Sequence, residues 1–214
     1  MGVLLRYAFF LAVVRPLVLV LLGLNVRHRE RLPVTGPAIL AANHNSHLDA
    51  LVLMSLVPLR LLPKVRPVAA ADYFLANRAL AWFSQRVVGI IPIHRGRTNQ
   101  AIDEKLAPIL AALERGDIVI FFPEGSRGEP ERLTEFKIGL GLLAERAPQA
   151  PVVPIFLHGL GKVLPRGEGI LVPFFCDVFV GEPVSRTPTP AAFMDAYRQQ
   201  MAALAAEGEF PEWA

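Results

Sequence analysis

The chain contains a single cysteine, Cys176, among its 214 residues. Without a second thiol no intrachain disulfide can form, and this composition fits a reducing compartment. Cys176 follows the apolar residues 172–175, which favours a buried structural thiol over a reactive one. Hydrophobic residues make up 53% of the chain and the mean hydropathy is +0.40, so the sequence predicts one folded domain that touches lipid rather than a disordered chain.

The N-terminal segment lacks an uninterrupted apolar run long enough to span a bilayer, which takes about 20 residues. Arg6 and Arg15 interrupt the segment and leave only the apolar stretches 7–14 and 16–24. We therefore expect residues 1–26 to form one or two short helices that lie in the membrane interface, in a peripheral or monotopic arrangement. A tilted span and a helix packed in the core are the alternatives.

Acidic residues are scarce in the same region. Residues 1–35 contain five arginines and one acid, a charge of +4, whereas the formal net charge of the whole chain is +3. An apolar terminus flanked by arginines predicts binding to an anionic membrane surface. The rest of the sequence has no basic patch interleaved with aromatic residues, so a nucleic-acid partner is not expected.

Beyond residue 27, short apolar runs alternate with helical patterns. Strands are expected at 37–42, 87–93, 118–122, 152–157 and 178–180. Helices are expected at 48–56, 71–85, 100–115, 133–146 and 190–206, the last with Thr189 as its N-cap. The alternation predicts an α/β domain over 27–214, with a mixed, largely parallel central sheet flanked by helices.

A polar island covers residues 43–49, between the apolar runs 38–42 and 51–54. Burying so many polar groups costs free energy unless they are paired or used. Its His44 and Asp49 are five residues apart. An imidazole can remove a proton while a carboxylate fixes its tautomer and stabilises its charge, so we predict a catalytic His–Asp pair.

Two further segments place polar residues after expected strands, where ligands bind in α/β proteins. In residues 122–129, Gly125 lets backbone amides approach a ligand closely, and the planar guanidinium of Arg127 suits a phosphate. A surface turn with a solvated Arg–Glu pair is the alternative. Arg95 follows the run 89–93 and, taken alone, fits a solvated loop arginine equally well.

Other patterns are weaker. His44 and His47 are three residues apart, but no third ligand stands at a suitable spacing, so no metal site is expected. Neither Ser46 nor Ser126 lies in the Gly-x-Ser-x-Gly context of a serine nucleophile. Trp82 and the nearby aromatic residues are expected in the core rather than in an acyl channel.

Taken in order, these segments resemble the glycerolipid acyltransferase family, that of the 1-acylglycerol-3-phosphate acyltransferases. Residues 43–49 match its Asn-His-x-Ser-x-x-Asp motif, and residues 89–95 are similar to its Gly-x-Ile-Pro-Ile-x-Arg block. Residues 122–127 match its Phe-Pro-Glu-Gly-Thr-Arg block, with Ser126 in place of threonine, and residues 152–155 match a looser apolar block. The resemblance runs from about residue 27 to about residue 185.

The resemblance implies a mechanism and a set of site residues. His44 would act as the general base on the hydroxyl of a lysolipid and Asp49 would orient it, so that the alkoxide attacks an acyl thioester without a metal or another cofactor. The implied acceptor phosphate site comprises Arg95, Glu124, Gly125, Ser126, Arg127 and, as an extra cation, Lys137. In it Glu124 would hold one of the two arginines. For Lys137 the alternative is a lysine on a helix surface.

We therefore expect a membrane-associated acyltransferase at the cytoplasmic face of the membrane. It would transfer a fatty acyl group from acyl-CoA or acyl carrier protein to a membrane lipid acceptor, most favourably 1-acylglycerol-3-phosphate, to give phosphatidate. The same chemistry on another lysolipid, such as a lyso-ornithine lipid, is the nearest alternative. A catalytically silent lipid-binding protein and a thioester hydrolase are alternatives of a different class.

Overall fold

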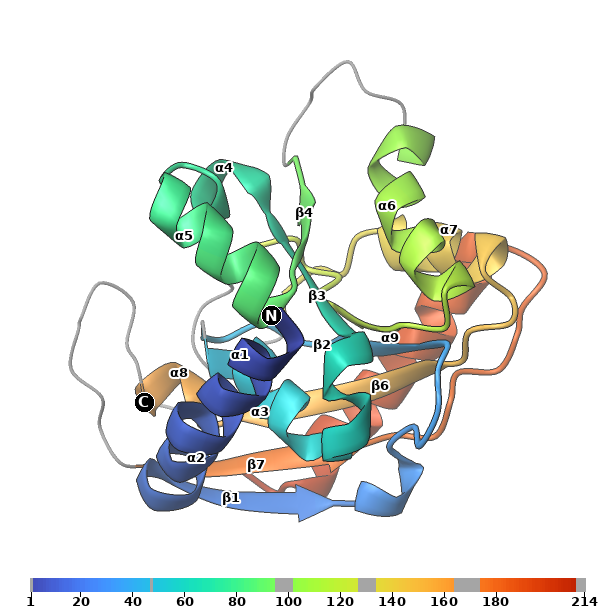
Figure 1. Ribbon diagram of the computed structural model, residues 1–214. Helices are drawn as coiled ribbons and strands as arrows, with labels where there is room; N and C mark the ends of the chain where they lie inside the picture. The colour runs from blue at the N-terminus through green and yellow to red at the C-terminus, as the bar shows by residue number, and fades with distance from the viewer. Residues whose placement is uncertain (1, 47, 95–101, 127–133, 164–173, 211–214) are drawn as a thin grey trace.

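The computed structural model describes residues 2–46, 48–94, 102–126, 134–163 and 174–210 of the chain. In this part of the chain one sheet has the strand order β1-β7-β6-β2-β5-β3-β4 (Figure 1). Its strands are β1 (Leu22–Arg27), β2 (Ala38–Ala42), β3 (Val65–Ala70), β4 (Ile91–Ile93), β5 (Ile118–Phe121), β6 (Val152–His158) and β7 (Phe174–Val180). Five of the six strand pairs are parallel and β6–β7 is antiparallel, which confirms the predicted mixed, largely parallel sheet.

Helices cover the sheet; short 3₁₀ and π segments carry the label η. They are α1 (Gly2–Phe9), η1 (Phe10–Val14), α2 (Arg15–Leu21), η2 (Arg29–Arg31), α3 (Leu48–Leu56), η3 (Leu59–Lys64), α4 (Ala71–Phe74), α5 (Arg78–Phe83), η4 (Ser84–Val88), α6 (Ile102–Glu114), α7 (Gly139–Arg146), α8 (Leu160–Val163) and α9 (Pro190–Glu207).

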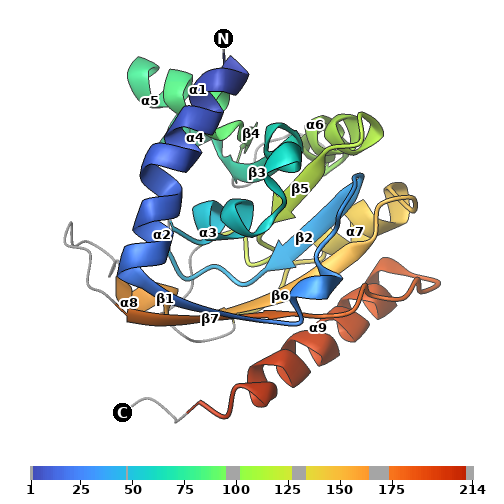
Figure 2. The ribbon, with the colours of Figure 1, turned by 60° about the horizontal axis from the view of Figure 1, so that its bottom comes forward.

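The central strands explain the layers. Every residue of β2 is buried, and its side chains alternate between two apolar clusters: Leu40 packs in one and Ile39 in the other. Because successive side chains of a strand point to opposite faces, each face needs its own cover. The helical segment α1-η1-α2 and helix α3 cover one face, and α6, α7 and α9 cover the other (Figure 2).

The N-terminal segment is one long helix in which α1, η1 and α2 follow each other without a break. Its buried residues recur every fourth position, at Arg6, Phe10, Val14, Val18 and, just beyond, Leu22. This spacing places them on one helix face, which packs on the sheet and α3. The stretch Gly2–Val20 is also long and apolar enough to cross a membrane, judged by length and composition alone.

Arg6 fixes this helix to the body of the protein. Its guanidinium donates to the carbonyl oxygens of Pro63 at 3.2 Å, Val65 at 2.5 Å and Val88 at 2.7 Å. Burial lowers the pKa of Arg6 to about 10, so the group keeps its charge at neutral pH. Sequence reasoning treated this arginine as an interruption of an apolar run, whereas it anchors the helix.

The N-terminal segment also contributes to the sheet. Strand β1 lies at its edge, pairs in parallel with β7, and crosses the boundary between residues 26 and 27 at which we placed the start of the α/β domain.

Three expected elements need correction. The expected helix at 71–85 is two helices, because Asn77 is extended and its side chain caps α5 by accepting from two backbone amides. The expected strand at 87–93 is strand only from residue 91, since residues 84–88 form the π segment η4, which ends at Gly89 with φ +75°. The expected helix at 133–146 begins at Gly139, so Lys137 precedes the helix instead of lying on it.

The prediction that Trp82 lies in the core was also wrong, because its side chain is 54% exposed.

Candidate functional site

The two main polar segments meet at one edge of the sheet. Residues 43–46 follow β2, and residues 122–126 follow β5. Because β2 and β5 are neighbours and run parallel, their carboxyl ends lie side by side. The fold therefore brings together two segments about eighty residues apart in the sequence, each of which follows a strand that the sequence predicted.

His44 and Asp49 form a hydrogen-bonded pair, with Nδ1 of the imidazole 2.8 Å from Oδ2 of the carboxylate. Asp49 is the second residue of α3 and is fully buried, and the same Oδ2 accepts from the amides of Asn45 at 2.6 Å and Ser46 at 2.8 Å. A carboxylate held by these donors favours the tautomer in which Nδ1 carries the proton. The lone pair on Nε2 is then free to accept a proton from a substrate.

The ring of His44 has a fixed orientation. It stacks on Phe122 with 4.2 Å between ring centroids and 21° between ring planes. The side chain keeps 14% of its surface exposed. The imidazole is thus held by a hydrogen bond at its edge and by an aromatic ring against its face, and it still reaches solvent.

Asn43 and Asn45 attach this segment to β6, a role that sequence reasoning missed. The side chain of Asn43 donates to Leu157 O at 2.8 Å and accepts from Leu157 N at 2.7 Å, and Asn45 donates to the same carbonyl at 3.0 Å. Backbone pairing between β2 and β6 ends at Ala42, so Asn43 continues the ladder with its side chain. The sequence feature that could have indicated this role is Asn43, an asparagine directly after the buried strand β2.

Glu124 lies under the His44 segment. Its side chain is buried, and Oε1 accepts from the backbone amide of His44 at 3.4 Å. Burial raises the pKa of Glu124, and hydrogen bonds from the Thr134 side chain and the His44 amide partly offset that rise. We expected Glu124 to hold Arg95 or Arg127, but both arginines lie outside the described residues, and so does His47.

Gly125 and Ser126 belong to the turn beside this carboxylate, and the side chain of Lys137 lies against Gly125. Gly125 has φ +74°, which favours glycine, and a Cβ atom there would lie 2.8 Å from Lys137 Nζ. The backbone amide of Lys137 donates to Pro123 O at 2.9 Å, and the exposed Ser126 ends the described part of the turn. The structure therefore brings the predicted extra cation to the predicted glycine.

Two other features bear on the site. In the part of the chain that the structure describes, no group of three His, Cys, Asp or Glu side chains is placed to hold a metal ion.

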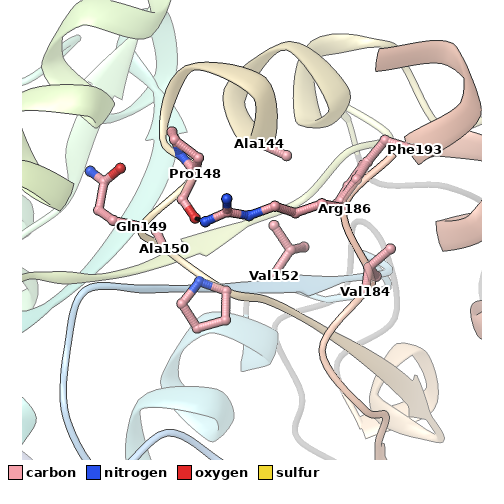
Figure 3. Close-up of a pocket in the computed structure, with 9 residues that line it drawn as sticks. Ala144, Pro148, Gln149, Ala150, Val152, Val184, Arg186 and Phe193 are labelled. Carbon is pink, nitrogen blue, oxygen red and sulfur yellow. Dashed lines mark hydrogen bonds between the residues drawn. The ribbon is translucent and has the colours of Figure 1, made fainter. Parts of the chain in front are cut away.

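A pocket of about 300 Å³ is lined by Val152, the first residue of β6, and is crossed by Arg186, which donates to Pro148 O (Figure 3). Since β6 runs parallel to β2, this pocket lies at the opposite edge of the sheet from His44 and is not part of the site.

Comparison with known proteins gives consistent results. The family model described as Acyltransferase matches residues 23–158. A chloroplastic 1-acyl-sn-glycerol-3-phosphate acyltransferase of Arabidopsis thaliana is 34% identical over 69% of this chain and 40% of its own length. The 1-acyl-sn-glycerol-3-phosphate acyltransferase alpha of Mus musculus is 31% identical over 83% of this chain and 61% of its own length.

A lyso-ornithine lipid O-acyltransferase of Rhizobium meliloti (strain 1021) is 32% identical over 65% of this chain and 45% of its own length. The chain thus spans between 40% and 61% of the length of these three relatives. The solved structure of PlsC, the 1-acyl-sn-glycerophosphate (LPA) acyltransferase of Thermotoga maritima, shares the fold. Its TM-score is 0.72 at 18% identity, and the match covers 99% of this chain and 81% of that one.

Proposed function

This chain belongs to the Acyltransferase family, and from that premise we propose that it transfers a fatty acyl group from an acyl thioester to the hydroxyl of a lysophospholipid. The observation that carries the proposal is the 2.8 Å contact between His44 Nδ1 and the buried Asp49 carboxylate. The favoured acceptor is 1-acylglycerol-3-phosphate, giving phosphatidate, because relatives named for that activity cover most of this chain.

The proposed reaction needs one base. Nε2 of His44 removes the hydroxyl proton, and the alkoxide attacks the thioester carbonyl. The new C–O ester bond forms as the C–S bond breaks, and the departing thiolate takes the proton from the imidazolium. Asp49 holds the ring in its tautomer and stabilises the transient positive charge.

The acceptor phosphate site is the turn after β5. Lys137 Nζ, close to Gly125, supplies a cation, whereas the Gly125 amide donates to Phe122 O at 3.1 Å. We assign Arg95, Ser126 and Arg127 to the same anion site, following the family motif. Glu124 supports the site from below through the His44 amide rather than by touching phosphate. No metal or other cofactor enters these steps, so turnover should survive a chelator.

The exposed apolar face of the N-terminal helix is the proposed membrane contact. One face is buried on the sheet, whereas Leu4, Leu11, Leu19 and Val20 on other faces are exposed. A helix that packs on its own domain by one stripe and exposes leucine and valine elsewhere suits a protein lying on the cytoplasmic surface of a bilayer. The basic residues of this region favour an anionic membrane.

The test is a panel of donors and acceptors with purified protein in detergent. Acyl-CoA and acyl-acyl carrier protein are each combined with lysophosphatidate, with a lyso-ornithine lipid or with no acceptor, and both thiol release and lipid product are measured. We expect phosphatidate, with release of thiol that requires lysophosphatidate.

The lyso-ornithine arm is included because one relative carries that activity. Product in that arm alone would show that the protein is an acyltransferase whose acceptor is a lyso-ornithine lipid. Thiol release without any acceptor would identify a hydrolase instead, and absence of release with every pair would identify a silent lipid-binding protein.

A further inference from the structure

A second concave surface lies at the N-terminal end of α1. It is a pocket of about 310 Å³ lined by Gly2 and Val3 together with three arginines, Arg6, Arg66 and Arg86. Arg66 is the second residue of β3, which runs parallel to β5 and hence to β2. This α1–η4 pocket therefore lies at the amino end of the strands, opposite the candidate site, and cannot be its acceptor subsite.

Positive charge in this pocket exceeds the negative charge paired with it. A Cβ atom at Gly89 would lie 2.9 Å from Nη1 of both Arg6 and Arg66, so the two guanidinium groups pack against the same glycine. Asp117 lies 3.5 Å from Arg66 Nε, but the same carboxylate oxygen lies 3.4 Å from Arg115. One carboxylate thus serves two arginines, and a bound anion would relieve the remaining repulsion.

The donors in the pocket suit a phosphate in particular. The guanidinium groups of Arg66 and Arg86 offer N–H donors that match phosphate oxygens, whereas Arg6, whose Nη atoms donate to backbone carbonyls, contributes charge. Gly2 and Val3 belong to the first turn of a helix that continues through η1 and α2, and amides of a first turn have no partner within the helix. They add N–H donors and the positive end of the helix dipole to the arginine cluster.

The surroundings of the pocket indicate a lipid rather than a free ion. Leu4, next to the lining residue Val3, is 75% exposed. In both ribbon views the N-terminal end of α1 lies beside α5, which carries the exposed Trp82 (Figures 1 and 2). Exposed apolar and aromatic side chains are typical of the bilayer interface, where phosphates lie.

We propose that the α1–η4 pocket binds the phosphate group of an anionic phospholipid in the membrane on which the protein lies. This assignment rests on the membrane association proposed above. The bound headgroup would hold the amino end of the strands against the bilayer and so set the orientation of the domain.

The test compares Arg86→Gln with Arg78→Gln in the full-length protein. Arg86 lines the pocket and is exposed, so its replacement spares the fold. Arg78 begins α5, is also exposed and does not line the pocket, so it is the matched loss of one charge. Binding is measured by co-sedimentation with vesicles of phosphatidylcholine alone or mixed with phosphatidylglycerol, in chloride or in inorganic phosphate at equal ionic strength.

We expect Arg86→Gln to weaken binding to the anionic vesicles about tenfold or more and Arg78→Gln to weaken it less, since Arg78 contributes only diffuse attraction to the anionic surface. Inorganic phosphate should weaken binding of the wild type and of Arg78→Gln more than chloride does, and should leave Arg86→Gln unaffected. Arg66→Lys, which keeps the charge but loses the paired donors, should behave like Arg86→Gln.

Equal losses of vesicle binding in Arg86→Gln and Arg78→Gln, with phosphate no more effective than chloride, would overturn the proposed phosphate site in the α1–η4 pocket. Binding would then depend on diffuse electrostatic attraction alone. Stabilisation of the wild type by inorganic phosphate, with vesicle binding unchanged in Arg86→Gln, would show that the pocket takes a free anion and would overturn the lipid assignment. A wild-type protein that binds no vesicle would overturn the proposed membrane association as well.

Discussion

One oxygen of Asp49 accepts from the imidazole of His44 and from two backbone amides. Because those amides belong to Asn45 and Ser46, the chain between His44 and Asp49 wraps around the carboxylate and fixes its position. The geometry is therefore local, and that is why the sequence alone could predict the pair.

Asp49→Asn should keep the wrap but remove the charge that steadies the imidazolium. We expect kcat to fall by about 10²-fold or more, in the range that acid–base catalysis contributes, with little change in KM. Thiol release at saturating substrate measures it. Asp72→Asn, an exposed aspartate in the first turn of α4, is the control and should keep normal turnover.

The buried carboxyl of Glu124 makes a prediction about pH. Since its pKa is raised in the folded state, the folded protein holds this proton more tightly than the unfolded chain. Ionisation above the ordinary value near 4.5 therefore costs folding stability, and the cost grows with pH until the raised pKa is passed.

Glu124→Gln removes that cost. Below pH 4.5 the variant and the wild type should therefore have the same free energy of unfolding, and above pH 4.5 the variant should become increasingly more stable than the wild type. Urea unfolding across this pH range measures the difference. Glu114→Gln, an exposed change at the end of α6, should show no such trend. A constant difference between Glu124→Gln and wild type at every pH would show that ionisation of Glu124 does not destabilise the fold.

The contacts of Asn43 and Asn45 with Leu157 were beyond prediction. They join positions more than a hundred residues apart and depend on β2 lying next to β6, and residue spacing carries no information about that pairing. The position of Glu124 under the His44 amide depends on strand pairing in the same way.

The N-terminal helix shows which elements the sequence could predict. Its helical nature followed from composition, but whether it lies on lipid, spans it or packs on the protein depended on where its two faces point. The buried residues from Arg6 to Val18 are four residues apart and mark the helix face that packs on the protein. The sequence contains this spacing, but it does not stand out there, because residues on the other faces of the helix are apolar too.

Replacing exposed leucines of this helix should therefore weaken lipid binding without unfolding the protein. We expect Leu11→Ser and Leu19→Ser each to weaken vesicle binding about tenfold, since burying one leucine is worth about 1.5–3 kcal/mol and 1.4 kcal/mol is tenfold. Val34→Ser, an exposed change outside the helix, is the control.

Phe10→Ala, on the buried stripe, should instead cost about 3–5 kcal/mol of folding stability. Vesicle binding that is unchanged in both exposed variants would contradict a membrane role for this face.

Short segments were less predictable than long ones. The helix at 190–206 and its Thr189 cap were right, because an eighteen-residue pattern with a local cap leaves little choice. The predictions for 71–93 were wrong in two places, because the cap at Asn77 divides the expected helix at 71–85 and the π segment η4 takes the place of the first residues of the expected strand at 87–93.

At the level of the whole molecule, the N-terminal segment is part of the fold. Strand β1 completes the sheet beside β7, Phe10 and Val14 lie in the core, and Arg6 binds three backbone carbonyls. Deleting residues 1–26 would uncover one face of the sheet and the edge of β7.

We therefore expect the truncated chain to aggregate or unfold rather than to remain as a soluble domain. Size-exclusion chromatography and circular dichroism would test this, with the truncation beside the intact Leu19→Ser variant. A monomeric, cooperatively folded truncation would show that the α/β domain is independent of its N-terminus.

The base of the proposed acyl transfer to a lysolipid is His44. The most direct measurement is lysophosphatidate-dependent thiol release by the wild type, His44→Ala and His28→Ala, where His28 pairs with Glu207 far from the site. We predict that His44→Ala loses at least about 10²-fold in kcat, while it keeps its fold and lipid binding, and that His28→Ala stays near normal. Near-normal, acceptor-dependent turnover by a folded His44→Ala protein would show that His44 is not the base.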